Sequence, residues 1–190
     1  MTAHTHDDAL KQVSVFGIGN VLLGDDGFGP LVIEMFRCHY ECGSNVEVLD
    51  LGTPGLDIAP YLYDRDLVIL IDAVHTGAEP GSSCLLPEVE LLYHRTHLNL
   101  TGHDPGIQGS LAHLKLAGHA PKELLVVGAE PQCCRFGEGI SPSMLAAASA
   151  ATAAIARLLH ERRVSCKRRP ASIPLKLWWL PQEPFLTATA

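Results

Sequence analysis

The chain has 190 residues, 47% of them hydrophobic and 18% charged, so it can bury a sizeable core and is not a disordered tail protein. Its formal net charge of −7 argues against a dedicated nucleic-acid-binding protein, which would carry a basic face. No apolar run reaches the roughly 18 residues that a membrane helix needs, and the polar segment 1–12 is not typical of a signal peptide. We therefore expect a cytoplasmic protein that binds neither nucleic acid nor membrane.

Short apolar runs and helical patterns alternate along the chain. The runs at 13–18, 46–51, 67–72 and 124–128, with a weaker one at 83–86, predict strands that are buried on both faces. Helices are predicted after the first strand, from about residue 56 or 57, over 107–117 and from 142 onward. Ser141 is the expected N-cap of the last helix, and Pro142 suits its first position. The apolar faces of these helices are predicted to consist of Phe28, Leu31, Val32, Met35 and Phe36, then Ile107, Leu111, Leu114 and Leu116, then Met144, Leu145, Ala148, Thr152, Ile155 and Leu159.

This alternation predicts an α/β fold, a three-layer α/β/α sandwich with a mainly parallel, roughly five-stranded twisted sheet. We expect one domain over 1–162, in which 1–12 is a polar extension, and then an arm over 163–190 that is basic and contains prolines and the pair Trp178–Trp179. Two interpretations of the arm remain open. It lies over the domain in extended form, with its tryptophans covering apolar surface, or it docks a partner.

The six cysteines show no metal-binding or disulfide framework, so we expect mostly buried, inert thiols in a reducing compartment. Cys38 and Cys42 are four residues apart on a predicted helix, a spacing that would also suit a metal. Packing is the preferred interpretation of this pair.

Candidate site residues follow the ends of the predicted strands, because ligands bind outside the carboxyl ends of strands in open α/β sheets. Asp25 and Asp26 follow the first strand, Asp72 ends the third, and His103 precedes the third helix. Carboxylate oxygens with an imidazole suit a borderline divalent cation such as Ni²⁺ or Zn²⁺. The simpler alternative remains that glycine-rich turns and a helix N-terminus account for the glycines and for Asp25 or Asp26.

Other enzyme classes are disfavoured by missing motifs. Gly17-x-Gly19 followed by Asp50 resembles a dinucleotide fingerprint, but Leu22 stands where the third glycine belongs, and there is no phosphate-binding GxxxxGK[ST]. The chain also has no HExxH and no GxSxG. Any hydrolysis would therefore depend on a metal or on a carboxylate that activates water.

Taken together, the segments Gly-Ile-Gly-Asn-Val-Leu-Leu-Gly-Asp-Asp-Gly-Phe-Gly at 17–29, Asp-x-Gly-Thr-x-Gly at 50–55, Asp72-Ala73 and His103 resemble the hydrogenase maturation proteases. These endopeptidases trim the C-terminal extension of the [NiFe]-hydrogenase large-subunit precursor. The resemblance covers about residues 13–160 and implies an α/β/α fold. It also implies a metal site whose ligands are Asp26, Asp72 and His103.

The resemblance implies an aspartyl-type endopeptidase that recognises nickel already held by the precursor's cysteine thiolates. The nickel is then supplied by the substrate, and no permanently bound cofactor is expected. Asp26 and Asp72 are the predicted catalytic residues, with water as the attacking group. The predicted substrate-binding residues are Gly17, Gly19, Asn20, Asp25, Gly52, Thr53 and Gly55. The expected partner is the large-subunit precursor, with the protease monomeric on its own; the alternative is a non-catalytic assembly factor that holds the nickel-loaded subunit.

Overall fold

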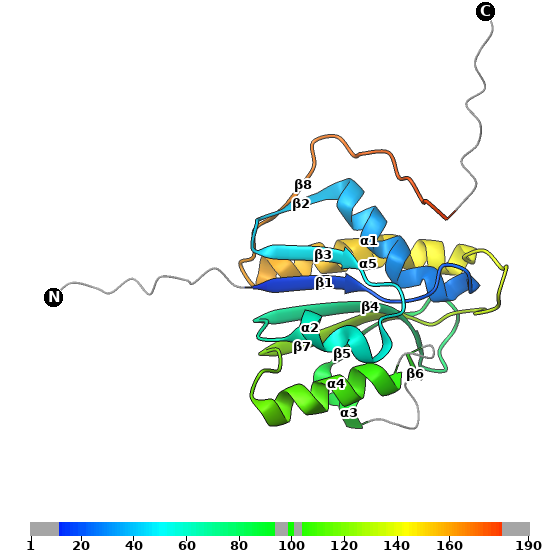
Figure 1. Ribbon diagram of the computed structural model, residues 1–190. Coiled ribbons are helices and arrows are strands. Elements are labelled where there is room, and N and C mark those ends of the chain that lie inside the picture. Colours follow the sequence, from blue (N-terminus) through cyan, green and yellow to red (C-terminus); the bar gives the residue numbers. More distant parts are fainter. Residues whose placement is uncertain (1–11, 94–98, 101–103, 180–190) are drawn as a thin grey trace, which may run out of the picture.

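The computed structural model describes residues 12–93, 99–100 and 104–179 (Figure 1). Its main sheet has the strand order β3-β1-β4-β7-β5. The bounds are β1 Val13–Gly17, β3 Val46–Asp50, β4 Leu67–His75, β5 Ser83–Pro87 and β7 Glu123–Ala129. The first four strands in the order are parallel, β5 is antiparallel to β7, and β6 (Asn99–Leu100) pairs antiparallel with β4. The predicted α/β class and the five predicted strands are confirmed.

The strands are buried because both faces of the sheet are covered by helices. Alternate residues of β4 point to opposite faces, so Ile69 and Ile71 enter one core cluster while Val68 and Leu70 enter the other. This division explains the continuous apolar runs in the sequence, since neither face of a central strand meets water.

One helical layer consists of α1 (Phe28–His39) and α5 (Pro142–Glu161), which pack against each other (Figure 1). The Ser141 cap is confirmed, since its side chain accepts a hydrogen bond from the Met144 backbone N–H. Helix α5 is apolar and long enough to cross a membrane by length and composition alone. Its apolar stripe lies in the core, which accounts for this composition. Leu145, however, was wrongly predicted to face the core and is 47% exposed.

The other layer contains the short elements η2 (Gly55–Ile58) and α2 (Ala59–Leu62), together with α4 (Asp104–Ala117). Ile107 and Leu111 of α4 are buried against the sheet, as predicted, whereas Leu116 is exposed. A further helix, α3 (Glu88–Tyr93), was not predicted and contacts β5 and β7.

The C-terminal arm is tied to the end of α1 by a second, two-stranded sheet. Strand β8 (Cys166–Arg168) pairs antiparallel with β2 (Tyr40–Cys42), so Cys42 lies directly opposite Cys166. The placement of Cys42 on a helix was therefore wrong, because α1 ends at His39 and the chain continues as a strand. Beyond β8 the arm runs across α1 in extended form and returns toward the carboxyl ends of the parallel strands (Figure 1).

The arm also contributes to the core. Leu177 and Trp179 pack against the cluster between α1, α5 and the sheet, whereas Trp178 is 69% exposed. The interpretation of the arm as an extended cover over apolar surface is thus confirmed for Trp179 and not for Trp178.

Candidate active site

The carboxyl ends of β1 and β4 form the point of the sheet at which a ligand site is expected. The two strands are neighbours in the sheet. From β1 the chain passes through α1, on one face of the sheet, to β3 on one side. From β4 it passes through α4, on the opposite face, to β7 on the other side. Such a change of direction opens a crevice outside the strand ends. Asp26 follows β1 and Asp72 belongs to β4, so the fold brings these two predicted residues to the same edge.

Asp26 lies in η1 (Gly24–Gly27), a 3₁₀ turn between β1 and α1, and it is buried. The Asn20 backbone N–H donates a hydrogen bond of 2.8 Å to Asp26 Oδ2. This contact depends on Gly19, whose φ is +138° and whose position leaves no room for a side chain, because an added Cβ would collide with the Asp26 carbonyl oxygen. The glycine-rich loop therefore folds back onto the carboxylate that it positions.

Asp72 is a residue of the strand itself. The sequence predicted a strand that ends at this position, but β4 continues to His75, because Asp72 and Ala73 pair with β7 and the next two residues pair with β6. Strand β1 ends opposite Ile71, so Asp72 is the first residue of β4 beyond its shorter neighbour. Its side chain is buried, and Oδ1 accepts a hydrogen bond of 2.8 Å from the Ala73 backbone N–H.

Cys134, which the sequence analysis did not place at the site, lies close enough to Asp26 and Asp72 for their charges to affect its pKa. Burial, followed by the negative charges of Asp26, Asp25 and Asp72, raises the pKa of the Cys134 thiol to about 12. The thiol is thus within electrostatic reach of both predicted catalytic residues and stays protonated near neutral pH. It was missed because the loop that carries it, 131–141, has no regular pattern in the sequence.

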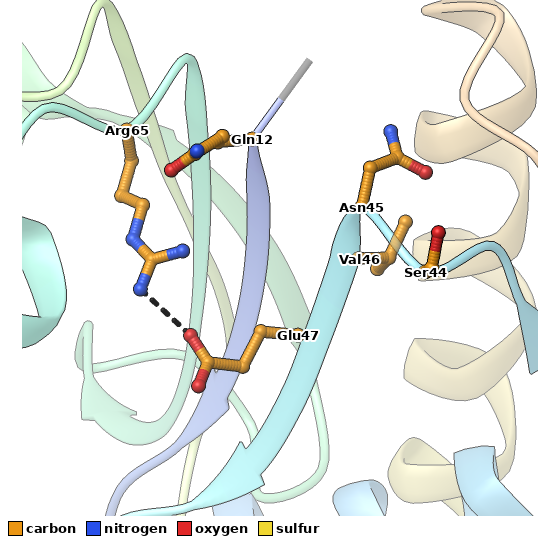
Figure 2. A pocket seen from close by; sticks show the side chains of 6 residues that line it. All are labelled: Gln12, Ser44, Asn45, Val46, Glu47 and Arg65. Carbon is orange, nitrogen blue, oxygen red and sulfur yellow. Dashed lines mark hydrogen bonds and ion pairs between the residues drawn. The ribbon is translucent and has the colours of Figure 1, made fainter. Parts of the chain in front are cut away.

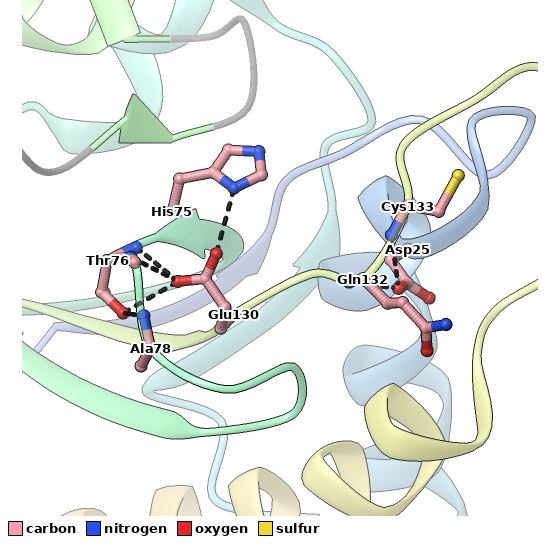
Figure 3. Close-up of polar contacts among 8 residues, drawn as sticks. Asp25, His75, Thr76, Ala78, Glu130, Gln132 and Cys133 are labelled. Atoms are coloured by element: carbon pink, nitrogen blue, oxygen red, sulfur yellow. Dashed lines mark hydrogen bonds and ion pairs between the residues drawn. The ribbon is translucent and has the colours of Figure 1, made fainter.

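The Asp25 carboxylate is held by hydrogen-bond donors of the chain itself, and Figure 3 shows those from Gln132 and Cys133. Oδ2 accepts hydrogen bonds from the backbone N–H groups of Gln132 and Cys133 and from the Ser141 hydroxyl, and Oδ1 accepts one from the Ser141 N–H. The residue is fully buried. Its geometry is that of a clamp between η1, the 131–141 loop and the start of α5.

The other predicted substrate-binding residues divide into two groups. Gly17 has a packing role, because a Cβ there would lie 2.6 Å from the Gly29 carbonyl oxygen. Gly52 and Gly55 have open space around them, and Thr53 between them is exposed. This loop begins at Asp50, whose pKa is raised by burial although its side chain accepts a hydrogen bond from the Gly52 N–H. The segment 52–55 therefore keeps the accessibility that a substrate-binding role requires.

A further carboxylate at this edge, Glu130, was missed by the sequence analysis. Glu130 follows β7, and its buried side chain accepts hydrogen bonds from the Thr76 N–H and hydroxyl and from the Gly77 N–H. It is also hydrogen-bonded, at 3.2 Å, to the half-exposed ring of His75 at the end of β4 (Figure 3). Burial raises the pKa of Glu130, but these hydrogen bonds outweigh it and leave the pKa below its ordinary value.

His103, the third predicted metal ligand, lies outside the described residues. Within the part of the chain that the structure describes, no group of three or more His, Cys, Asp or Glu side chains could hold a metal ion. The two buried carboxylates supply hard oxygen donors that suit a divalent cation but need a further ligand to hold one.

An open, polar hollow of about 630 Å³ lies at the opposite end of the sheet, beside the amino-terminal ends of β1 and β3 (Figure 2). Its charged groups, Arg65 and Glu47, already neutralise each other through an ion pair of 2.7 Å. Because ligands of open α/β sheets bind at the other edge, this hollow is not the candidate site.

An α/β/α sandwich with buried carboxylates at the carboxyl edge of its sheet defines an open α/β protein with a candidate site where such folds bind their ligands, and comparison with known proteins gives the family. The model of the hydrogenase maturation protease family matches residues 30–158. The chain is 31% identical to the hydrogenase expression/formation protein HupD of Rhizobium leguminosarum over 86% of this chain and 82% of that protein. It is 29% identical to the hydrogenase 2 maturation protease of Escherichia coli, over 84% of this chain and 98% of that protein. Among solved structures, the hydrogenase maturating endopeptidase HybD of Escherichia coli aligns with a TM-score of 0.77 at 29% identity, covering 83% of this chain and 98% of that chain.

The chain therefore belongs to the hydrogenase maturation protease family, and it is an endopeptidase. This agrees with the resemblance noted in the sequence. The alternative of a non-catalytic assembly factor is disfavoured, because the family and its solved members are peptidases.

Proposed function

We propose that this endopeptidase removes the C-terminal extension of a [NiFe]-hydrogenase large-subunit precursor after nickel has been inserted. The observation that carries the proposal is the pair of buried carboxylates, Asp26 and Asp72, at the carboxyl ends of two adjacent parallel strands. The names of the relatives, which connect them with hydrogenase maturation, support the choice of client.

Nickel belongs to the substrate in this proposal. Asp26, Asp72 and His103 are the proposed ligands that the protease offers to an ion already held by the precursor's cysteine thiolates. Two carboxylates buried near each other are disfavoured by desolvation and mutual repulsion, and an incoming cation offsets both effects. A precursor without nickel would forgo this stabilisation, so binding and cleavage become dependent on nickel insertion.

The proposed chemistry uses the same carboxylates. Asp26 or Asp72 takes a proton from a water molecule, and the hydroxide adds to the carbonyl carbon of the scissile peptide bond. A loop N–H polarises the carbonyl oxygen, as oxyanion-type donors do. The tetrahedral intermediate then collapses, the C–N bond breaks, and the leaving amine takes up the proton. Six cysteines without disulfides suit the reducing cytoplasm, which is the compartment that we propose.

The test is cleavage of a purified large-subunit precursor, with and without nickel, followed by mass spectrometry of the products. We expect the wild-type protease to remove the extension only from the nickel-loaded precursor. Equal cleavage of both forms would contradict recognition through nickel, and no cleavage of either would contradict the proposed activity.

The same assay tests the ligands. Asp26→Asn, Asp72→Asn and His103→Ala should each lower the cleavage rate by about 100-fold to 10,000-fold, the range for loss of a positioned acid–base or ligand group. Asp57→Asn, at an exposed position, is the matched control. Circular dichroism must accompany these variants because Asp26 and Asp72 are buried and their substitution can disturb the fold. Full processing by the His103→Ala protein would refute the role of that residue.

A further inference from the structure

An apolar pocket of about 410 Å³ lies beside the catalytic edge, and the C-terminal arm forms one of its walls. Three segments that are distant in the sequence build it. They are the glycine-rich loop through Val21 and Leu22, the loop 136–140, and the arm through Leu177 and Trp179. Leu145 of α5 completes the lining.

The pocket shares its walls with the active site. The Gly137 N–H donates a hydrogen bond of 3.0 Å to the Leu22 carbonyl, so the two loops that line the pocket are joined to each other. The same glycine-rich loop presents Asn20 to the Asp26 carboxylate, and the same 131–141 loop is clamped by Asp25. The pocket is therefore built from the same two loops that flank Asp25 and Asp26.

The side chains around the pocket are apolar and accessible. Leu22 is 55% exposed, Phe136 is 79% exposed, and Leu145 is the residue that was wrongly predicted to be buried. Neighbouring exposed apolar side chains of this kind mark binding surfaces. Their position against the catalytic edge favours a segment of the substrate as the occupant over an unrelated partner.

The arm is fixed well before it reaches the pocket. Beyond the pairing of β8 with β2, the backbone N–H of Arg169 donates to the His39 carbonyl and that of Ile173 donates to the Cys38 carbonyl. Leu177 and Trp179 then pack on the core cluster. The wall is thus part of the folded protein, although its residues follow Glu161, the last residue of α5, in the sequence.

We propose that this pocket binds an apolar side chain of the precursor close to the scissile bond, and that Leu177 and Trp179 of the arm help to determine which precursor is cut. The proposal rests on the proposed function, because its occupant is the substrate of that reaction. It assigns the arm the role of a specificity element that uses apolar contact, separate from recognition through nickel.

The test measures kcat and KM for cleavage of the nickel-loaded precursor. Phe136→Ser and the double variant Leu177→Ser with Trp179→Ser should raise KM by about tenfold, since each removes apolar contact area from the bound segment. The value of kcat should not change, because the pocket contacts no reacting atom. Leu175→Ser, which alters an exposed apolar residue of the arm outside the pocket, is the matched control and should keep the wild-type KM.

Phe136 is mostly exposed, so its variant separates loss of binding from loss of folding. Wild-type cleavage with unchanged KM in the pocket variants would overturn the inference while leaving the proposed function intact. An equal rise in KM for Leu175→Ser would overturn it as well. If deletion of residues 180–190 lowered KM tenfold, the occupant of the pocket would be the chain's own C-terminal segment and not the substrate. That result would also overturn the inference. No cleavage by the wild-type protein would instead overturn the proposed function, and the inference with it.

Discussion

Asp25 and Asp26 are adjacent in the sequence, but their carboxylates lie in different surroundings. Asp25 accepts four hydrogen bonds from Gln132, Cys133 and Ser141, whereas the Asp26 carboxylate lies at the carboxyl edge beside Asn20. In a 3₁₀ turn, consecutive side chains point in directions about 120° apart. Asp25 therefore holds the 131–141 loop, while Asp26 accepts a hydrogen bond from the glycine-rich loop that precedes it.

We expect Asp25→Asn to lower the free energy of unfolding by about 3 kcal/mol, because an amide nitrogen would face N–H donors inside the protein. Chemical denaturation of the variant and of the exposed control Asp57→Asn measures the difference. A wild-type stability for Asp25→Asn would show that the clamp between η1 and α5 is not needed for folding.

Glu130 provides a pH dependence of stability. Its pKa lies below the ordinary value of 4.5 in the folded protein, because four hydrogen bonds to Thr76, Gly77 and His75 favour the carboxylate. The stabilisation is fully present above the unfolded-state pKa and is lost as the pH falls through the lower folded-state pKa. The free energy of unfolding of Glu130→Gln should be about 2 kcal/mol lower than that of the wild type at neutral pH, and the difference should shrink progressively in acid.

Urea denaturation across pH 3 to 7 measures this effect, with Glu161→Gln at an exposed position as the control. A difference between wild type and Glu130→Gln that stayed constant down to the lowest pH would contradict the assignment.

At the scale of elements, the pairing of β2 with β8 determines where the arm can go. The Cys42 thiol donates a hydrogen bond to Cys166 Sγ at 3.0 Å, directly across the two strands. This hydrogen bond, together with burial, raises the pKa of Cys42, and the same bond lowers the pKa of Cys166. Cys166 is therefore the thiol that forms the thiolate first.

We expect oxidised glutathione to link Cys42 and Cys166. The Cys166 thiolate attacks glutathione disulfide and releases one glutathione thiolate, and the Cys42 thiolate then displaces the second. The rate should rise with pH as Cys166 loses its proton. Peptide mapping after alkylation of the remaining thiols identifies the bond, and Cys42→Ser should abolish it. A glutathione adduct that persists on Cys166 of the wild-type protein, without the intramolecular bond, would contradict the register of the two strands.

At the scale of the whole molecule, two segments far apart in sequence meet beside the edge of the sheet that carries Asp26 and Asp72. The arm starts near the end of α5, crosses α1 and returns to the loops that hold Asp26 (Figure 1). The sandwich supplies the carboxylates and the arm supplies an apolar wall, so the two forms of recognition that we propose, by nickel and by apolar contact, depend on different parts of the chain.

The sequence by itself determined the layers and the main carboxylates. Buried strands such as β1 and β4 are continuous apolar runs, the cap at Ser141 is a local signal, and the carboxyl ends of parallel strands necessarily meet at one edge, which placed Asp26 and Asp72 together. These features depend on the order of residues over short distances, or on a rule of sheet topology.

Only the tertiary structure decided the contacts that depend on distant segments. It separated the roles of Asp25 and Asp26, brought Cys134 and Glu130 to the site, extended β4 past Asp72, and left Leu145 exposed beside the pocket. Each depends on a partner that is far away in the chain, such as Ser141 for Asp25 or β6 for β4. The pattern of residues within one segment does not predict such a partner, because a long-range contact forms only when the whole chain is folded.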